Sequence, residues 1–310
     1  MRISPKAAIA GCLMLCSAIA AAGTAFADWR DDVQVLRVGV LAGEESAYRV
    51  TTLEPFRIFL QDRTGIPVEI VPAASYEDLI EAQASGRVDY AIYSATSYAT
   101  AVAECQCVTA IAAPIAADGA LGFHSILLSA SGSGIASLAD ARGKRIALTG
   151  AGSVAGRLIP EQAFAKEGIV PDDYFAEVKT VPDPEAAISA LLAGEVEVAV
   201  AWSGLTGDAT AGYDFGVLAQ MVGDGALSIH RVRIIWQSRL IPFGPHAVRT
   251  DLPDELRSLL AHSLAAMARS DPAALDAVDR QGFGGGGFAT PDPSLYTVVM
   301  ELVEPEPVSQ

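Results

Sequence analysis

Hydrophobic residues recur at helical spacing in some stretches of the chain and at every second position in others. The stretch 75–98 shows both patterns most clearly. Apolar residues at helical spacing follow Ser75, a typical N-cap residue, and Gly86 suits the left-handed residue that ends a helix. Every second residue is then apolar, as in a strand, and the strand leads into a hydroxyl-rich turn at 93–98. The pattern predicts a helix, a buried strand and the start of a second helix.

The same pattern returns at 183–204. Asp183 precedes a second apolar helical face, Gly194 suits the end of that helix, and a strand then leads into a polar turn at 202–204. Two copies of helix, glycine, strand and turn predict two similar lobes. Each lobe would present the end of a strand to something that lies between them.

Strand and helix patterns alternate along the rest of the chain. Further strands are predicted at 35–41, 68–71, 108–115, 123–129, 145–148, 176–181 and 229–236. Further helices are predicted at 51–63, 97–104, 253–269, 272–278 and 293–303, and the glycine-rich run 282–287 predicts a loop. This alternation is typical of an α/β fold with helices on both faces of each sheet, where ligands bind at the carboxyl ends of the strands.

The long strands 123–129 and 231–236 are the predicted crossovers between the lobes. The first lobe would then contain residues 28–124 and 236–310, and the second lobe residues 125–235. Residues 1–27 have the basic start, apolar centre and A-x-A end of a signal peptide, which predicts cleavage after Ala27 and a soluble extracytoplasmic protein. A short uncleaved anchor remains the alternative for this segment.

Charge narrows the classes of partner. The formal net charge is −16, and removing the segment 1–27, which holds two basic and no acidic residues, makes it −18. Such a surface argues against binding to nucleic acid or to anionic lipid, and we expect a monomer. Cys105 and Cys107 form a C-x-C pair that we interpret as a local loop feature outside the main function, either oxidised to a small disulfide or reduced. No metal site and no cofactor are predicted, because no set of ligands has suitable spacing.

The turn 150–156 follows a predicted strand and opens a predicted helix. Its free amides and the positive end of the helix suit an anion, although a tight turn capped by Ser153 explains the same residues. The glycine spacing fits neither a Walker loop nor a dinucleotide fingerprint. The turn is therefore a candidate anion site with a purely structural alternative.

Tyr93 and Trp202 lie at equivalent strand ends of the two repeats. They could clamp a ligand between the lobes or simply pack at the surface of each lobe. Tyr48 is a weaker candidate, and His124 lies beside a predicted crossover, where a position in the cleft is plausible. No catalytic arrangement is recognisable, so the chain is not predicted to be an enzyme.

Five stretches, 45–101, 118–128, 137–160, 234–257 and 287–299, resemble the phosphate/phosphite/phosphonate-binding periplasmic proteins of ABC transporters. The Gly-Phe-His-Ser and Ser-Arg-Leu-Ile-Pro pieces are the most specific. The resemblance implies a type II periplasmic binding protein fold, with two α/β lobes, a two-strand hinge and a ligand between them. It also implies an ABC permease in the inner membrane as the partner.

The resemblance carries over unevenly to the binding residues. The family's pocket tyrosine matches Tyr93, and its Ser-Thr-Ser-Gly turn aligns with Ser153, Val154, Ala155 and Gly156. Losing two hydroxyl donors to a charged ligand costs about 3–6 kcal/mol, because each contributes roughly 1.5–3 kcal/mol. A tight tetrahedral phosphonate site is therefore weakened, and a carboxylate or another small polar organic ligand becomes a contender.

The function predicted from the sequence is that of an extracytoplasmic solute-binding protein with no cofactor. A periplasmic sensing module that partners a membrane kinase or another receptor is the alternative. The candidate ligand-binding residues are Tyr93, Ser94 and Thr96 in the first lobe, Ser153, Val154, Ala155, Gly156, Trp202 and Ser203 in the second, and more weakly Tyr48 and His124.

Overall fold

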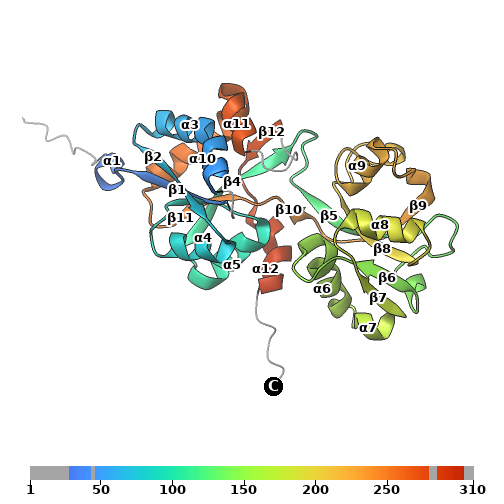
Figure 1. The fold of residues 1–310 in the computed structure, drawn as a ribbon. Coiled ribbons are helices and arrows are strands. Elements are labelled where there is room, and N and C mark those ends of the chain that lie inside the picture. Colours follow the sequence, from blue (N-terminus) through green and yellow to red (C-terminus); the bar gives the residue numbers. More distant parts are fainter. Residues whose placement is uncertain (1–27, 43–45, 279–284, 304–310) are drawn as a thin grey trace, which may run out of the picture.

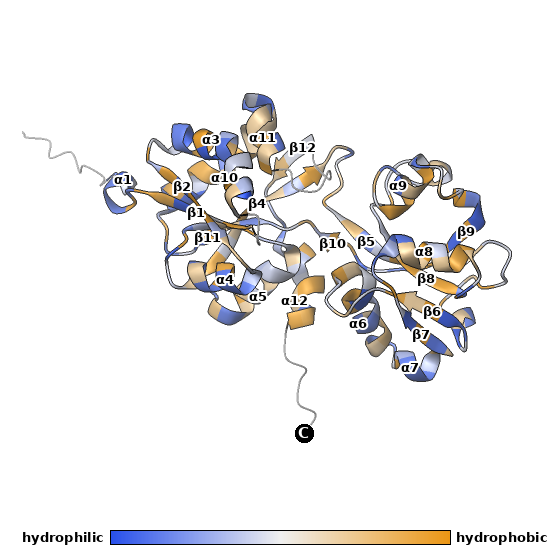
Figure 2. Cartoon of the chain, viewed as in Figure 1, coloured by the Kyte–Doolittle hydropathy of each residue, from blue (hydrophilic) through white to orange (hydrophobic). Residues whose placement is uncertain are grey.

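The computed structural model describes residues 28–42, 46–278 and 285–303, so the predicted signal peptide lies outside the described residues. Two lobes lie side by side, each built on a six-stranded sheet with helices around it (Figure 1). Figure 2 shows apolar residues concentrated along the strands and polar residues on the outward faces of the helices. This α/β architecture with two lobes agrees with the fold class predicted from the sequence.

The sheet of the first lobe has the strand order β12-β4-β11-β3-β1-β2. Strands β1 (Leu36–Leu41), β2 (Val68–Ala73) and β3 (Tyr90–Ile92) are parallel. The other strands are β4 (Val108–Ala116), β11 (His246–Arg249) and β12 (Gly285–Ala289). Strand β11 is antiparallel to both β3 and β4, and β12 is antiparallel to β4. The carboxyl end of β3 is therefore next to the amino end of β11.

Helices cover both faces of this sheet (Figure 1). One face packs against α3 (Glu54–Thr64), α10 (Asp254–Ser270) and α11 (Pro272–Val278), whose leucines and phenylalanines form one buried cluster. The other face packs against α4 (Tyr76–Ala84) and α5 (Ala95–Cys105). The short helices α1 (Trp29–Asp32) and α2 (Ser46–Thr52) complete the lobe.

The second lobe has the strand order β10-β5-β8-β6-β7, and β9 pairs with β5 beside β10. The strands are β5 (Gly122–Ala130), β6 (Arg145–Leu148), β7 (Glu177–Thr180), β8 (Val198–Ser203), β9 (Val232–Gln237) and β10 (Ile241–Pro242). The helices are α6 (Ile159–Lys166), α7 (Pro171–Tyr174), α8 (Pro184–Leu192) and α9 (Val217–Gly223). They enclose a single large core cluster.

The repeated unit predicted from the sequence is confirmed in its local details. Ser75 accepts a hydrogen bond from the amide of Asp78 at 3.1 Å, and Asp183 accepts one from the amide of Ala186 at 2.7 Å. Gly86 and Gly194 have left-handed φ values of 75° and 74°, which suit glycine because it has no Cβ. Each helix therefore begins and ends where its cap and glycine predict.

Two local predictions were wrong. The helix expected at 51–63 is two helices, because Pro55 has no amide proton for the helical bond that would join α2 to α3. The glycine run expected as a loop contributes 285–287 to strand β12, and 282–284 lie outside the described residues. A Cβ on Gly286 would lie 2.3 Å from the carbonyl oxygen of Ala116, so only glycine allows this close pairing with β4.

The chain passes from the first lobe to the second at 117–121, between β4 and β5. It returns at 243–245, between β10 and β11. Both strands expected to form the crossovers lie within the second sheet instead. The predicted boundary after 124 lies three residues beyond the first crossing, and the predicted boundary after 235 lies eight residues before the second.

The last described helix, α12 (Thr297–Val303), follows the short helix η6 (Pro293–Tyr296) and lies between the lobes (Figure 1). Its apolar residues pack with α5 of the first lobe and with α6 of the second. Glu301 pairs with Lys166 on α6 and with Arg239, 3.4 Å away, near the second crossing. The helix therefore connects the two lobes outside the chain crossings.

Two further observations concern the environment of the protein. Cys105 and Cys107 form a disulfide at the end of α5, which decides between the two predicted states of this pair. Within the described ranges, none of the helices has both the length and the apolar character needed to cross a membrane.

Candidate functional site

A cavity of about 190 Å³ lies where the two lobes meet, at the carboxyl end of β3. Its first-lobe wall comes from Tyr76, the turn 92–96, Pro114, His246, Leu275, Val278, Gly287 and Phe288. Its other wall comes from the second lobe and the second crossing, through Phe123, Val154, Ile241, Pro242, Phe243 and Gly244. Strand ends of both lobes therefore meet at one partly open cavity, as predicted for this type of sheet.

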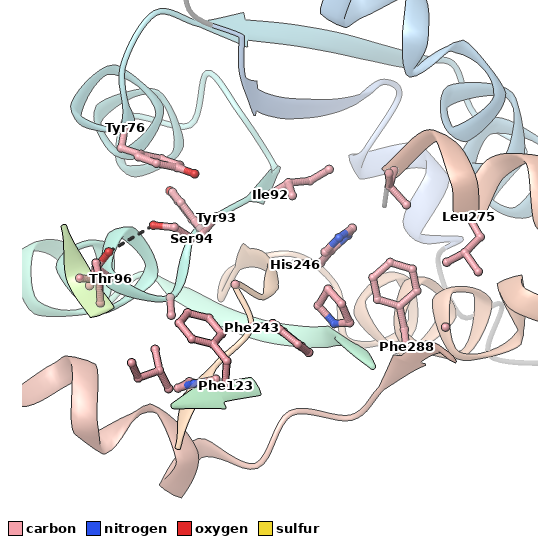
Figure 3. Close-up of a pocket in the computed structure, with 18 residues that line it drawn as sticks. Tyr76, Ile92, Tyr93, Ser94, Thr96, Phe123, Phe243, His246, Leu275 and Phe288 are labelled. Atoms are coloured by element: carbon pink, nitrogen blue, oxygen red, sulfur yellow. Dashed lines mark hydrogen bonds between the residues drawn. The ribbon is translucent and has the colours of Figure 1, made fainter. Parts of the chain in front are cut away.

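One end of the cavity is formed by the start of α5 (Figure 3). Ser94 caps the helix by accepting a hydrogen bond from the amide of Ser97 at 3.1 Å, and the Ser97 hydroxyl accepts one from the Ser94 amide at 2.9 Å. The hydroxyl groups of Ser94 and Thr96 are 3.3 Å apart. The amides of the first helical turn, the helix dipole and these hydroxyls together suit an anionic group.

Tyr93 also lines the cavity, but its hydroxyl group is used within the first lobe. It donates a hydrogen bond to Oε1 of Gln83 at 2.9 Å, and Gln83 in turn donates to the carbonyl of Ala247 at 3.1 Å. Burial raises the pKa of the Tyr93 hydroxyl far above its ordinary value, so the group stays neutral. The ring of Tyr93 is the part that remains for contact with a ligand.

The opposite end of the cavity is aromatic and aliphatic (Figure 3). Phe288 lies edge-on to the ring of His246, with 4.7 Å between the ring centroids. Nδ1 of His246 is hydrogen-bonded to the hydroxyl of Tyr90, and both residues are buried. Phe243 packs beside Phe123 at 6.2 Å along the wall that faces the second lobe.

The turn 150–156 contributes one side chain to the cavity, that of Val154. The Ser153 hydroxyl caps the turn by accepting from the amide of Gly156 at 3.2 Å, and the carbonyl of Ala155 accepts from Ser125 at 2.6 Å. The turn opens a π-helical segment, η3 (Val154–Leu158), before α6 begins. The Ser153 hydroxyl and the Ala155 carbonyl are therefore used within the second lobe, and the side chain that this turn presents to the cavity is apolar.

The remaining candidates lie away from the cavity. Trp202 packs edge-on against Phe123 at 5.4 Å, and it is Phe123 that reaches the cavity. Ser203 is fully buried and accepts a hydrogen bond from the amide of Leu205 at 3.1 Å. Tyr48, 69% exposed, lies on α2. His124 lines a separate hollow, where its Nδ1 is 2.9 Å from the carbonyl oxygen of Ser238.

Sequence reasoning missed several of the residues that line the cavity, namely Tyr76, Phe123, Phe243, His246 and Phe288. Tyr76 follows the end of β2 directly, and a position after a strand end is the signal that could have found it. Phe123 lies in β5, Phe243 in the second crossing, and His246 and Phe288 in strands β11 and β12, whose place in the sheet no local pattern indicates.

Comparison with known proteins decides which family the fold and cavity represent. The model of a family described as "ABC transporter, phosphonate, periplasmic substrate-binding protein" matches residues 38–296. The chain belongs to this family. Membership agrees with the resemblance noted in the sequence, and the family description names a binding component of a transporter rather than an enzyme.

One curated relative of this family member is the phosphonates-binding periplasmic protein of Escherichia coli K12. The two are 26% identical over 226 residues, which are 71% of this chain and 62% of the relative. The match thus spans less than two thirds of the relative's length.

Solved structures share the fold of this family member at lower identity. A Xanthomonas citri protein bound to ATP has a TM-score of 0.62 and 21% identity, over 87% of this chain and 95% of that one. A Prochlorococcus marinus protein in complex with methylphosphonate has a TM-score of 0.56 and 14% identity, over 87% and 97% of the two chains. These likenesses establish a two-lobed binding protein fold.

Proposed function

We propose that this protein is the extracytoplasmic solute-binding component of an ABC transporter, and that it holds a small ligand with a phosphonate-like head between its lobes. The observation that carries the proposal is the cavity shared by the two lobes, with the capped start of α5 at one end. Family membership supports the transport role over the sensing role that the sequence left open.

The head of the ligand would bind at the start of α5. Thr96 supplies a hydroxyl group there, beside the Ser94 hydroxyl that caps the helix, and the first amides of the helix point out of its end. None of the described residues that line the cavity is Lys or Arg, so the head would be held by neutral donors and the helix dipole. Each hydrogen bond to a charged group contributes roughly 1.5–3 kcal/mol, so a few of them support binding.

Ligand binding would close the lobes, because contacts with both walls exist only when the walls approach the same molecule. Val154 and Phe123 supply the second wall. A ligand shifts the balance between open and closed forms only as far as its contacts differ between them. The closed form is the one that we propose a permease in the inner membrane recognises, with the binding protein acting as a monomer.

Calorimetry on ligand-stripped protein tests this function. The panel is methylphosphonate, phosphite, phosphate, acetate and methylamine, and small-angle X-ray scattering follows the radius of gyration with and without each compound. We expect a saturable heat and a smaller radius with the phosphonate, and recovery of that compound unchanged. Absence of heat with every anion of the panel and with longer alkylphosphonates would contradict the proposed function.

A further inference from the structure

We propose that the ligand is a phosphonate with an apolar substituent, an alkyl- or arylphosphonate, rather than inorganic phosphate or an aminoalkylphosphonate; this identification of the ligand class rests on the function proposed above. The cavity that carries the proposal has a polar end and an apolar end, and its two ends match the two parts of such a molecule.

The polar groups lie together at one end of the cavity. Figure 3 shows the hydroxyl groups of Ser94 and Thr96 beside each other, with Tyr76 above them. Phe288 and Leu275 lie at the far side of the cavity, and Phe243 and Phe123 lie along its lower wall. A head bound at the hydroxyl groups would therefore direct its substituent toward side chains that are apolar except for His246, whose Nδ1 is already hydrogen-bonded to Tyr90.

No acidic side chain is found among the described residues that line the cavity. An ammonium group on the ligand would lose its water and find no carboxylate in exchange. The Tyr93 hydroxyl, a possible polar partner, already donates to Gln83. The lining thus discriminates against a zwitterionic aminoalkylphosphonate and admits an uncharged substituent.

The second lobe presents an apolar wall at the position where an anion seat was considered. Val154 faces the cavity, while Ser153 caps its own turn. Pro242 and Phe243 extend this wall along the second crossing. Contact with the second lobe, which closure requires, is therefore hydrophobic, and inorganic phosphate has no apolar surface with which to make it.

The size of the cavity limits the substituent. A dry apolar cavity of about 150 Å³ holds one benzene molecule. With about 190 Å³ for head and substituent together, the substituent is limited to a short alkyl chain or at most one small ring. Methylphosphonate would leave most of the apolar wall without contact.

Calorimetry of the ligand-stripped protein with methyl-, ethyl-, butyl-, phenyl- and 2-aminoethylphosphonate tests the ligand class. Burial of one methylene group tightens binding about fourfold. We expect affinity to rise along the alkyl series by at least tenfold in total, phenylphosphonate to match the butyl compound, and 2-aminoethylphosphonate to bind more weakly than its ethyl counterpart. Equal affinity for methyl and butyl compounds, or preference for the aminoethyl compound, would overturn the ligand class and leave the proposed function standing. Binding of no phosphonate would overturn both.

Val154→Thr gives the matched variant, because it keeps the shape of the side chain and replaces a methyl group with a hydroxyl. We expect butylphosphonate to bind about threefold to tenfold more weakly and the affinity for methylphosphonate to change less. Val170→Thr makes the same chemical change at a position 58% exposed in the second lobe, and it should leave the alkyl series unchanged. Phe288→Leu is a second variant, which reduces the apolar surface at the other side of the cavity. Thermal denaturation confirms that each variant is folded. An unchanged alkyl series in both Val154→Thr and Phe288→Leu would contradict the proposal.

Discussion

Tyr93 and Tyr76 both line the cavity, but we expect different roles for their hydroxyl groups. The Tyr93 hydroxyl donates to buried Gln83, whereas the Tyr76 side chain is half-buried and lies over the polar end of the cavity (Figure 3). Position after a strand end predicted Tyr93 as a neighbour of a ligand and could have indicated Tyr76 as well. It cannot show which hydroxyl is used inside the lobe, because Gln83 reaches Tyr93 only through tertiary packing.

Tyr93→Phe should therefore act mainly on stability. It leaves Oε1 of Gln83 without its donor, so we expect the free energy of unfolding to fall by about 1–2 kcal/mol in urea denaturation. Tyr76→Phe should leave stability near that of the unmodified protein and weaken ligand binding about tenfold in calorimetry. The reverse pattern would show that Tyr93 is the hydroxyl donor to the ligand.

Thr96→Val tests the polar end of the cavity. The substitution keeps the branched shape and removes a hydroxyl beside Ser94, so we expect phosphonate affinity to fall roughly tenfold to hundredfold. Thr100→Val is the control on the same helix, since its hydroxyl donates to the Thr96 carbonyl at 3.1 Å and it does not line the cavity. Equal losses in the two variants would point to a general effect on α5.

At the scale of elements, the repeated unit also places a carboxylate at the base of each sheet. Asp89, just before β3, accepts a hydrogen bond from the amide of Arg37 at 2.9 Å. Glu197, just before β8, accepts one from the amide of Arg145 at the same distance. The equivalent contacts extend the internal likeness of the lobes beyond their caps and glycines.

The two carboxylates should respond to pH in opposite directions. The Arg145 guanidinium lowers the pKa of Glu197 below its ordinary value of 4.5, so its stabilisation is present above that pH and is lost as pH falls further. Burial raises the pKa of Asp89 above 3.8 despite Arg37 and Arg249, so its contribution to stability falls as pH rises through that range.

Urea denaturation at pH 3 and pH 7 measures this difference. We expect Glu197→Gln to be less stable than the unmodified protein at pH 7 and to approach it at pH 3. Asp89→Asn should lose less stability at pH 7 than Glu197→Gln, because ionised Asp89 is already destabilised by burial. A larger loss at pH 3 than at pH 7 for Glu197→Gln would contradict the assignment. Exposure of both partners in the Arg145 pair keeps the effect small.

The sequence predicts helix and strand ends that depend on contacts between neighbouring residues. It does not predict which strands pair when the pairing joins distant parts of the chain. Ser75, Gly86 and their counterparts in the repeat mark helix ends through contacts with neighbouring residues. Strand β11 was missed because the prolines and glycine that precede His246 are typical of a turn, and its pairing with β3 and β4 joins distant parts of the chain. The apolar end of the cavity depends on that pairing, so it could not be predicted either.

At the scale of the whole molecule, α12 ties the lobes together through Glu301. Residues of α12 are predominantly apolar where it lies between the lobes (Figure 2). The ion pair between Glu301 and Lys166 forms in this arrangement of the two lobes. It should therefore oppose any movement that separates α6 from α12.

Closure that separates α6 from α12 should therefore become easier in Glu301→Gln, and for that direction of closure we expect ligand affinity to rise about twofold to fivefold, the range open to a partly exposed ion pair. Glu195→Gln removes the comparable pair with Lys179, which lies inside the second lobe, and should leave affinity unchanged. Calorimetry with butylphosphonate measures both. An unchanged affinity in Glu301→Gln would show that the pair persists in the closed form.

A crystal structure of the protein with butylphosphonate tests the central claim most directly. The account predicts a phosphonate head within hydrogen-bond distance of Thr96 and the first amides of α5, with the butyl chain against Val154 and Phe243. A head bound instead at the turn 150–156, with the chain directed into solvent, would contradict it.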